Sequence, residues 1–596
     1  MAMASTFLSN NSLGSGLNTK ASTSSAWPLH QQRSQVSGGV RRRHSLRQSL
    51  LISCKGRRDA DNAVPFIDRR NMLIGLGGLY GAASSIGFDA VAAPIAPPDL
   101  SKCGPADLPA GAIPTNCCPP FNDKIVDFKF PSFTKMRVRP AAHRAADDQE
   151  YMERFTKAVK LMRELPKDDP RNFTQQANVH CAYCDGAYDQ VGFPNLELQV
   201  HNSWLFFPFH RCYLYFFERI LGKLIGDESF AIPFWNWDAP KGMIMPPIYT
   251  DPSSSLYDKL RDAAHQPPKV IDLDYNGVDP TTTDRQQIID NLTIMYRQMV
   301  SNARTPQLFL GSPYRAGDNP DPGAGSVENV PHGPVHVWTG DRTQPNGEDM
   351  GNFYSAARDP IFYAHHANVD RMWTLWRQMG GTHKDFTDSD WLDAGFLFYD
   401  ENAQLVRVKV RDCLDIAKLG YSYQQVEVPW LKSRPTTRRV AGTASVDSAK
   451  KKADATDAAS VFPRKLDSVL KVIVKRPKKS RSKKEKEEED ELLVIDQIEV
   501  GRDVPAKFDV FINVEDHKKH GPATSEFAGS FVNVAHKHKH SKKPTVLKTR
   551  LRLGITELLE DLGAEQDDEV VVTLVPRYGK DAITIGEVHI EHHAVS

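Results

Sequence analysis

The sequence predicts an α+β protein of several domains, in which a mainly helical region is followed by an antiparallel β-rich region. The chain has 596 residues, several times the length of an average domain. Its composition, 40% hydrophobic and 25% charged, is typical of a globular protein with a sizeable core. Collagen-like, coiled-coil and largely disordered chains are thereby excluded. The spacing of apolar residues changes from helical to alternating near residue 463.

The first 58 residues have the composition of an organellar transit peptide. They contain no Asp or Glu, are rich in Ser, and carry the basic cluster Arg41, Arg42, Arg43 and Arg47. A disordered basic arm that binds nucleic acid is the alternative interpretation. The whole chain has no basic excess, since 75 basic residues face 74 acidic ones. We therefore expect a transit peptide over residues 1–58 and no nucleic-acid partner.

A second targeting signal is predicted over residues 59–92. Arg69 and Arg70 precede a short, Gly-rich apolar run, and Ala90-Val91-Ala92 offers a small-residue cleavage site. The run is a poor membrane span, which needs about 20 apolar residues, so a retained anchor is the less favoured alternative. Two signals in series predict passage through the chloroplast import machinery and then the twin-Arg translocation machinery into the thylakoid lumen. Without residues 1–92 the net charge is −6.

Residues 93–432 are predicted to form the helical domain. Apolar residues recur at helical spacing over 151–165 and 285–300, which predicts two amphipathic helices. The segment 204–220 is apolar on nearly every face, as in a buried helix. Residues 433–462 contain almost no large apolar side chain, and we interpret them as a linker that is exposed to proteases.

Residues 463–596 are predicted to be rich in β-structure. Alternating apolar runs separated by turns favour an antiparallel sandwich or barrel. The run 475–491 changes from basic to acidic, and we expect a solvated loop there. The predicted strands are 469–474, 492–500, 508–514, 531–534, 569–575 and 582–590.

Two clusters of histidines in aromatic surroundings form a candidate metal site. His332 and His336 are four residues apart, so they share one face of a helix if that helix begins beside Pro331 and Pro334. In the first cluster, His201 and His210 are nine residues apart and would lie on opposite faces of a straight helix. Pro208 between them permits a bend that brings the two side chains together. The clusters are His180, His201 and His210, and His332, His336 and His366.

Three imidazoles per metal leave an open coordination position for a small ligand. Because neither cluster includes a thiolate or a paired carboxylate, the set suits redox-active copper as well as zinc. A single histidine is more often an ordinary core or surface residue, but six in two clusters favour metal binding. A third group, His536, His538 and His540, is surrounded by lysines that disfavour a cation, and a solvated edge is the preferred interpretation.

The chain resembles the type-3 copper proteins and, over nearly its full length, the plant polyphenol oxidases (catechol oxidases). The resemblance includes both targeting signals, both histidine clusters, and the motifs Asp390-Trp391-Leu392, Tyr421-Ser422-Tyr423 and Lys507-Phe508-Asp509-Val510. It implies a mainly α-helical dicopper (tyrosinase-like) core domain at 93–432, followed by an antiparallel β-sandwich C-terminal domain at 463–596. The latter resembles the family's shielding domain, which covers the copper entrance until an activating protease cuts the linker.

The resemblance also assigns metal ligands. It implies that His180, His201 and His210 bind copper A and that His332, His336 and His366 bind copper B. In the adjacent pair His365-His366, the second residue matches the family ligand and the first does not.

Cysteine roles follow from the same resemblance. It implies the disulfide bonds Cys103–Cys118 and Cys117–Cys181, and a thioether bond from the Cys184 sulfur to the His201 ring, which would fix the orientation of that imidazole. An oxidising lumen permits disulfides; four buried free thiols are the alternative. Cys212 and Cys413 are interpreted as buried structural thiols.

Three further residues match family positions beside the copper ions. Glu328 matches the residue that holds a water near copper B, and a carboxylate that merely favours the start of a helix is the alternative. Phe353 matches the gate residue, whose ring lies over copper A and can stack on an aromatic substrate. Gly333 stands where true tyrosinases often carry Asn, which argues against efficient monophenol hydroxylation.

The resemblance implies an enzyme with two copper ions that oxidises o-diphenols to o-quinones and reduces dioxygen to water. A monophenol-hydroxylating oxidase is the nearest alternative. An oxygen carrier of the haemocyanin kind and a zinc-bound structural or storage protein are more distant ones. The expected partners are a small phenol and dioxygen, with no stable membrane span.

Overall fold

The computed structural model describes residues 93–133, 135–435, 454–501, 503–535 and 546–595. The predicted transit peptide (1–58), the predicted transfer signal (59–92), the middle of the predicted linker and the histidines at 536, 538 and 540 lie outside the described residues. The expectations for those segments stay predictions. Within the described ranges, no helix is both long and apolar enough to cross a membrane. Below, residues 93–435 are called the N-terminal part and residues 454–595 the C-terminal part.

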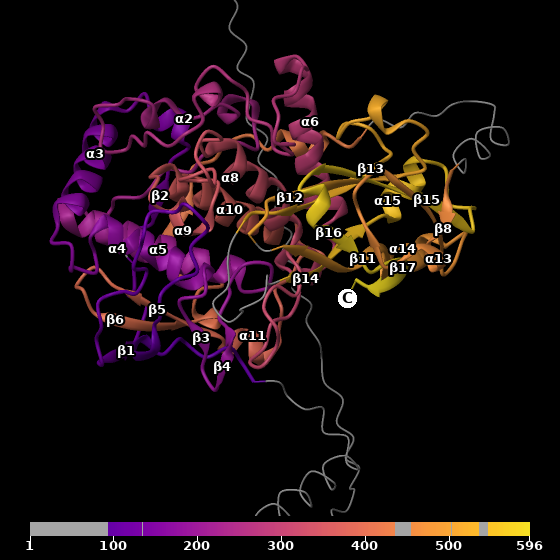
Figure 1. Ribbon diagram of the computed structural model, residues 1–596. Coiled ribbons are helices and arrows are strands. Elements are labelled where there is room, and N and C mark those ends of the chain that lie inside the picture. Colours follow the sequence, from indigo (N-terminus) through magenta and orange to yellow (C-terminus); the bar gives the residue numbers. More distant parts are fainter. Residues whose placement is uncertain (1–92, 134, 436–453, 502, 536–545, 596) are drawn as a thin grey trace, which may run out of the picture. The chain divides into compact units, whose positions relative to one another are not determined.

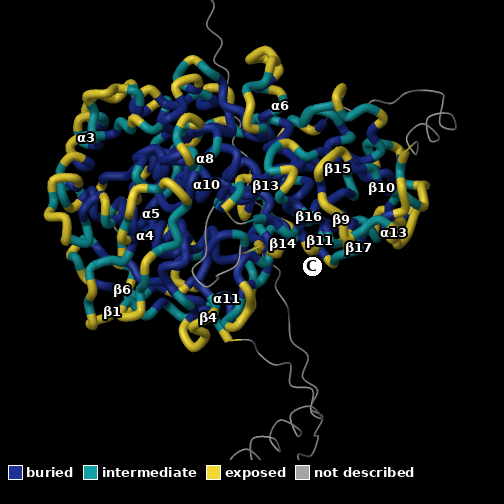
Figure 2. The backbone as a smooth tube through the Cα atoms, viewed as in Figure 1, coloured by how far each residue is buried: buried dark blue, intermediate teal, exposed yellow. Residues whose placement is uncertain are grey.

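Two long buried helices form the centre of the N-terminal part (Figures 1 and 2). α5 (Phe206–Ile225) and α10 (Ile361–Gln378) pack against each other, and both are buried along most of their length. The buried helix predicted at 204–220 is therefore confirmed as α5. Its apolar side chains lie on every face because α3 (Gln149–Glu164) and α10 pack on different sides of it.

The two predicted amphipathic helices are present. The first is α3, which begins at Gln149 because the Asp148 carboxylate accepts a hydrogen bond from the backbone N–H of Tyr151. The second is α6 (Asp284–Tyr296), where the Thr283 hydroxyl caps the first turn, and the chain then continues as a π-helical turn over Arg297–Ser301.

Shorter elements complete the N-terminal part. Its strands form a three-stranded sheet in the order β1-β6-β5 and the pairs β2–β7 and β3–β4. The parallel β2–β7 pair joins residues 137–139 to residues 421–423, so both ends of this part are held together. The helices are α2 (Ala142–Ala145), α4 (Phe173–Cys184), α7 (Pro306–Leu310), α8 (Gly333–Thr339), α9 (Phe353–Ala356) and α11 (Ser389–Asp393). The strands are β1 (Ile125–Asp127), β2 (Arg137–Arg139), β3 (Asp189–Gln190), β4 (Phe193–Glu197), β5 (Gly395–Tyr399), β6 (Leu405–Lys409) and β7 (Tyr421–Tyr423).

The C-terminal part consists of two sheets that share one apolar cluster. The first has the order β13-β12-β15-β10-β8, and the second has the order β14-β11-β16-β9 with β17 also paired to β11. All of these pairs are antiparallel except β8–β10. Val472 and Leu574 from the first sheet and Leu493 and Leu551 from the second lie in the same buried cluster.

The bounds of these elements are as follows. The strands are β8 (Thr456–Asp457), β9 (Arg464–Lys465), β10 (Leu470–Lys475), β11 (Glu489–Gly501), β12 (Ala506–Ile512), β13 (Phe527–Asn533), β14 (Val546–Gly554), β15 (Glu569–Tyr578), β16 (Ile583–Ile585) and β17 (Glu587–Ala594). The helices are α13 (Ala458–Val461), α14 (Lys483–Glu488) and α15 (Thr556–Asp561).

Each predicted strand run is found, but the last of them is two strands, β16 and β17. Sequence reasoning missed β14 altogether. The signal was present: Leu547, Thr549, Leu551 and Leu553 are buried and alternate with basic residues, which keep their charged ends toward solvent.

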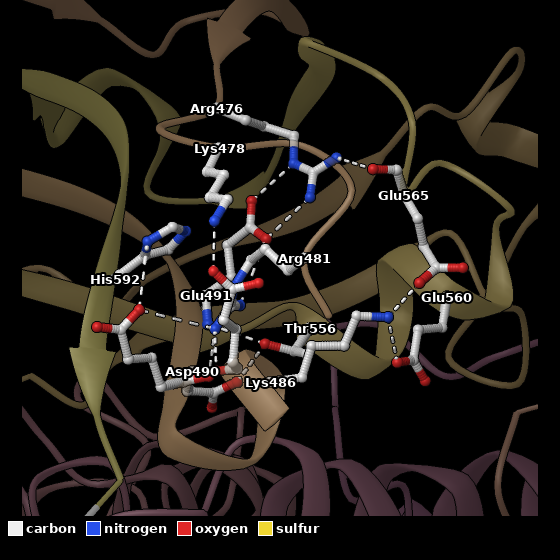
Figure 3. A network of polar contacts seen from close by, with 12 residues as sticks. Arg476, Lys478, Arg481, Lys486, Asp490, Glu491, Thr556, Glu560, Glu565 and His592 are labelled. Carbon is white, nitrogen blue, oxygen red and sulfur yellow. Dashed lines mark hydrogen bonds and ion pairs between the residues drawn. The ribbon is translucent and has the colours of Figure 1, made fainter. Parts of the chain in front are cut away.

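The charged run 475–491 is largely solvated, as expected, but it contains regular structure and is not simply a loop (Figure 3). It ends β10, forms α14 and begins β11. The Arg476 Nε lies 2.7 Å from the Glu491 Oε1, and both side chains are buried. Arg304 of the N-terminal part donates a hydrogen bond to the buried Asp490 at 2.9 Å. A loop was the wrong expectation because Arg476 near the start of the run pairs with Glu491 at its end, whereas α14 between them has no buried residue and its charges face solvent.

Candidate metal centre

Histidines from distant segments converge on two adjoining clusters. Within each cluster, one possible ligand atom of every member lies within 4.8 Å of those of the others. The rings of His210 and His366 stack with their centroids 4.2 Å apart, so the two clusters adjoin. The first cluster is His180, His201 and His210, and the second is His332, His336, His365 and His366.

The first cluster is assembled from α4, a loop and α5. His180 lies in α4 and His210 in α5, but α5 begins only at Phe206, so His201 lies in the preceding loop. The bent helix that we expected to carry both His201 and His210 is therefore wrong. Pro208 lies in the first turn of α5, where proline is tolerated and no bend is needed.

The Gln199 side chain holds this loop in place. Its Oε1 accepts hydrogen bonds from the backbone N–H groups of Val200 and His201, at 2.9 and 3.0 Å. Its Nε2 donates to the backbone carbonyl of Cys184 at 2.9 Å. One buried amide thus joins the segment of His201 to the end of α4, an organising role that the sequence did not reveal.

The second cluster follows the spacing prediction. α8 begins at Gly333 with Pro334 in its first turn, so the helix does begin beside the prolines. The ring centroids of His332 and His336 are 4.6 Å apart. His366 comes from α10, and its Nε2 lies 3.3 Å from the Nε2 of His336.

Backbone carbonyl groups fix the tautomers of four of these rings. In each case Nδ1 lies 2.8 or 2.9 Å from a carbonyl oxygen, which can only accept, so Nδ1 carries the proton and Nε2 keeps its lone pair. The pairs are His180 with Phe353, His210 with Phe206, His332 with Glu328, and His336 with Met350.

The donor set fits two copper ions. Among the described residues, the buried Nε2 atoms of His180, His210 and His332 have no hydrogen-bond partner, an arrangement that a metal would satisfy. Burial lowers the pKa of His180 to about 3 and that of His336 to about 4, so both rings are neutral at physiological pH and can act as ligands. Both clusters consist of imidazoles alone, which suits a type-3 dinuclear copper centre.

His365 differs from its neighbours in its hydrogen bond. The Trp237 Nε1–H donates to His365 Nδ1 at 3.1 Å. A ring nitrogen that accepts a hydrogen bond does so through its lone pair and carries no proton. The neutral His365 ring therefore holds its proton on Nε2. His365 therefore lacks the free Nε2 lone pair that the other rings present.

Glu328 joins the two clusters. Its carboxylate accepts hydrogen bonds from the backbone N–H of Asn202, directly after His201, and from that of Gly325 at 3.4 Å. Its own backbone carbonyl accepts the His332 Nδ1–H. The carboxylate is buried, and this desolvation raises the pKa of Glu328.

The Phe353 ring lies directly against the first cluster. It stacks on the His201 ring with a centroid distance of 4.1 Å and an interplanar angle of 15°. Because the Phe353 carbonyl also holds His180, this residue touches two of the three histidines.

The C-terminal part reaches the second cluster through β13. A methyl group added to Gly333 would lie 3.1 Å from Val532 Cγ1 and 3.5 Å from Val534 Cγ2. Both valines are buried within the hydrophobic core of the N-terminal part. Residues Phe527–Val534 are called the cover strand below.

Asn329 is a second contact between the cover strand and this motif. Its Nδ2 donates to the Ser530 carbonyl and its Oδ1 accepts from the Val532 N–H at 2.9 Å. Sequence reasoning missed the contact between the cover strand and the histidine motif, which involves Asn329, Val532 and Val534. An alternating apolar pattern predicts a strand but does not say which surface that strand will cover.

The cysteines pair as the family resemblance implies. Cys103 is bonded to Cys118, and Cys117 to Cys181, which directly follows His180. The other described cysteines, Cys184, Cys212 and Cys413, are buried and outside these bonds.

Three family models match successive segments between residues 170 and 592. The family model described as the common central domain of tyrosinase matches residues 170–379. The polyphenol oxidase middle domain matches residues 385–436, and the chloroplastic polyphenol oxidase C-terminal domain matches residues 462–592.

Individual relatives are similar over most of both chains. The chain is 60% identical over 579 residues to a chloroplastic polyphenol oxidase of Malus domestica, which covers 95% of this chain and 96% of the relative. It is 58% identical over 535 residues to one of Vitis vinifera, with 88% and 87% covered. The solved structure of latent apple tyrosinase has a TM-score of 0.74 and 61% identity, covering 79% of this chain and all of the other. With this identity and two buried histidine clusters that fit a dinuclear copper centre, the chain belongs to the plant polyphenol oxidases of the type-3 copper family, oxidoreductases that act on phenols.

Proposed function

We propose that the protein oxidises o-diphenols to o-quinones and reduces dioxygen to water. The observation that carries this proposal is the convergence of two clusters of buried imidazoles, four of which have Nδ1 held by a backbone carbonyl and Nε2 left to face a metal. Copper A would be held by His180, His201 and His210, and copper B by His332, His336 and His366. When bound, the copper pair supplies electron transfer and activation of oxygen.

His366 rather than His365 is the proposed ligand of copper B. The hydrogen bond from Trp237 leaves His365 with its proton on Nε2, whereas a neutral metal-bound imidazole must offer a lone pair. The adjacent His365 would instead pack beside the site, where its ring lies parallel to that of His332 at 5.4 Å.

Phe353 and Glu328 are proposed to act on the substrate. The Phe353 ring beside His201 offers a flat apolar surface on which an aromatic substrate can be oriented. The Glu328 carboxylate accepts a backbone N–H from the loop of the other cluster in addition to the Gly325 N–H at the start of its own helical segment. This contact favours a role in holding a water that accepts the phenol proton over a purely helix-stabilising role.

Monophenol hydroxylation is the second candidate function. Gly333 lacks a side chain that could hold a water beside His332, which argues against it. A (+)-larreatricin hydroxylase of Larrea tridentata is nevertheless 52% identical over 578 residues. Oxygen uptake measured side by side with tyramine, tyrosine, catechol and caffeoyl esters distinguishes the two activities.

The C-terminal part is proposed to keep the enzyme latent. We infer that its two sheets form a sandwich that acts as the shielding domain (463–596), joined to the core domain (93–432) by the protease-sensitive linker (433–462). The packing of Val532 and Val534 against Gly333 supports this proposal, as does the similarity to latent relatives. An activating protease would cut the linker, and oxygen uptake with catechol should then rise. A precursor that is already fully active would contradict the shielding role.

A thioether between Cys184 and His201 is also proposed. Gln199 bonds to the backbone of both residues and so brings their segments together. Intact-mass measurement should show two hydrogens missing beyond those lost to disulfide bonds. A full complement of hydrogens would refute the bond.

We propose the chloroplast, and within it the thylakoid lumen, as the location. The two predicted signals support this proposal, and relatives from Malus domestica and Vitis vinifera are named chloroplastic. The import and twin-Arg translocation machineries would then be transient partners. A fluorescent fusion that stays in the stroma would contradict the lumenal part of the proposal.

The central test of function uses the copper-loaded, linker-cleaved protein with catechol as substrate. We expect oxygen consumption and a quinone absorbance that appear together. A folded sample with two coppers per chain that consumes no oxygen would overturn the enzyme proposal.

A further inference from the structure

Asn329 pairs with the cover strand as a neighbouring β-strand would. Its Nδ2 donates to the Ser530 carbonyl, and its Oδ1 accepts from the Val532 N–H. These two backbone groups flank a single residue, Phe531, which is the pattern of alternate donors and acceptors along one edge of a strand. The carboxamide therefore recognises extended peptide backbone rather than a particular side chain.

The same strand directs Val532 and Val534 toward the second histidine cluster, and Val532 is the nearer of the two to Gly333. Val532 contacts Gly333, the residue that directly follows His332. Phe531 points to the opposite side, where its ring stacks on Phe508 with a centroid distance of 5.2 Å. The backbone contact at Asn329 thus sets which residue of an extended chain faces the metal centre.

Asn329 lies among residues proposed to take part in the reaction, so its contact with the cover strand can affect substrate binding. Asn329 lies between Glu328 and His332 and is only 8% exposed while the cover strand is in place. Among the described residues, both polar atoms of its side chain are bonded to the cover strand. When the cover strand leaves, a donor and an acceptor become available beside the space that Val532 and Val534 had filled, and a substrate that offers the matching pair regains both hydrogen bonds.

We propose that Asn329 is a specificity-determining residue that selects o-diphenols carried on an extended peptide backbone, that is, catechol amino acids preceded by an N-acylated residue. The catechol side chain takes the position of Val532 over Gly333. The flanking carbonyl and N–H take the positions of the Ser530 carbonyl and the Val532 N–H. This inference rests on the proposed diphenol oxidase function and adds a substrate class to it.

The test compares three substrates of the full chain, loaded with copper and cut within 433–462. The first is acetyl-glycyl-3,4-dihydroxyphenylalanine amide, whose acetyl carbonyl matches that of Ser530 and whose dihydroxyphenylalanine N–H matches that of Val532. The second carries a methyl group on that nitrogen and so lacks the donor. The third, 4-methylcatechol, has no tail. Because any cover strand that remains bound competes equally with both dipeptides, the ratio of their KM values does not depend on its release.

We expect the methylated dipeptide to have a KM about tenfold higher than the unmethylated one. Asn329→Leu should reduce this ratio to within about twofold, since leucine has similar size and no amide. The matched control is Asn302→Leu, because Asn302 also donates to a cover-strand carbonyl, that of Ala528, and accepts from Gly554. Asn302 lies outside the histidine motif, so the Asn302→Leu variant should keep the tenfold ratio between the KM values of the two dipeptides.

Copper content and circular dichroism check that both variants fold. The comparison of the two dipeptides on the unaltered chain is independent of that folding. Equal KM values for the two dipeptides, or an Asn329→Leu protein that still separates them tenfold, would overturn the proposal. Failure to oxidise 4-methylcatechol as well would overturn the diphenol oxidase function itself, and this inference with it.

Discussion

The two histidine clusters are held in different ways. The first is enclosed by elements of the N-terminal part, with Gln199 and Phe353 in contact with its ring-bearing segments. The second has the same ligand chemistry, but its motif also touches the C-terminal part through Gly333 and Asn329. The comparison teaches that two clusters of the same ligand chemistry can be held differently: the first lies among elements of the N-terminal part, whereas the second also contacts the C-terminal part.

The largest expected effect comes from removing a ligand of the second cluster. His336→Ala should lower the copper content from two ions to one per chain, because the first cluster keeps its three rings. Catechol oxidation should fall at least about 100-fold, since even residues that only support a metal ligand are worth 10–100-fold. Atomic absorption and oxygen uptake measure the two effects.

The matched control is His265→Ala, because His265 is also buried but bonds to the Trp338 carbonyl and to Asp279 instead of joining a cluster. That variant should keep two coppers. A His336→Ala protein that retains both ions would break the proposed division between the clusters.

The next effect concerns the cover strand. Gly333→Leu should push against Val532 and Val534, and overpacking of this kind costs about 1–3 kcal/mol. The activity of the uncut chain, expressed as a fraction of that of the same variant after cleavage, should rise about fivefold or more. Gly333→Ala should give a smaller rise, because its methyl group needs only a small shift of Val532. An unchanged fraction in both variants would show that the valines do not control access.

A third prediction addresses the first cluster. Gln199→Leu removes four buried hydrogen bonds, one of them to the His201 Nδ1, and should lower the free energy of unfolding by about 2–4 kcal/mol. Denaturant unfolding of the copper-free protein measures this loss. Gln176→Leu, which removes one side-chain bond to the Pro170 carbonyl, should cost less. Equal losses would argue against a special role for Gln199.

The smallest effect is a pH dependence of the contact between the two parts. Lys507 of the C-terminal part lies 3.1 Å from Asp274, with Asp509 and Asp272 close by. Burial raises the pKa of Asp274 to about 7 from an ordinary value of 3.8. Folding therefore takes up a proton at Asp274, so the stability that this group contributes is fully present below about pH 4 and is lost as the pH rises through 7.

The uncut chain should accordingly have a lower free energy of unfolding at pH 8 than at pH 5, and Asp274→Asn should lose less over the same range. The pKa of Lys507 is raised and lies above this range, so it does not reverse the sign. Denaturant unfolding at the two pH values measures both differences. An equal loss in the Asp274→Asn variant would contradict the assignment.

Short-range sequence patterns predicted the parts of the site whose structure depends on residues nearby in the chain. The spacing of His332 and His336 with the two prolines gave the start of α8, and the apolar segment gave α5. The position of His201 was not predictable in this way, because a glutamine amide in a loop, not a helix, brings it to His210.

Long-range pairing explains the remaining failures. The run 475–491 folded into ordered structure because Arg476 meets Glu491 across adjacent elements. Asn329 meets β13 although about 200 residues separate them, and no periodic pattern encodes such a contact. The copper-site motif was therefore readable from the sequence, but the surface that covers it was not.

The place of the cover strand in the chain has a consequence for the order of assembly. The last histidine of the two clusters, His366, precedes Phe527 at the start of β13 by about 160 residues. A polypeptide that tends to fold domain by domain from its N-terminus would complete both clusters before the strand that contacts the second one folds. We expect this interval to leave the second cluster open to metal delivery until β13 folds against Gly333 and Asn329.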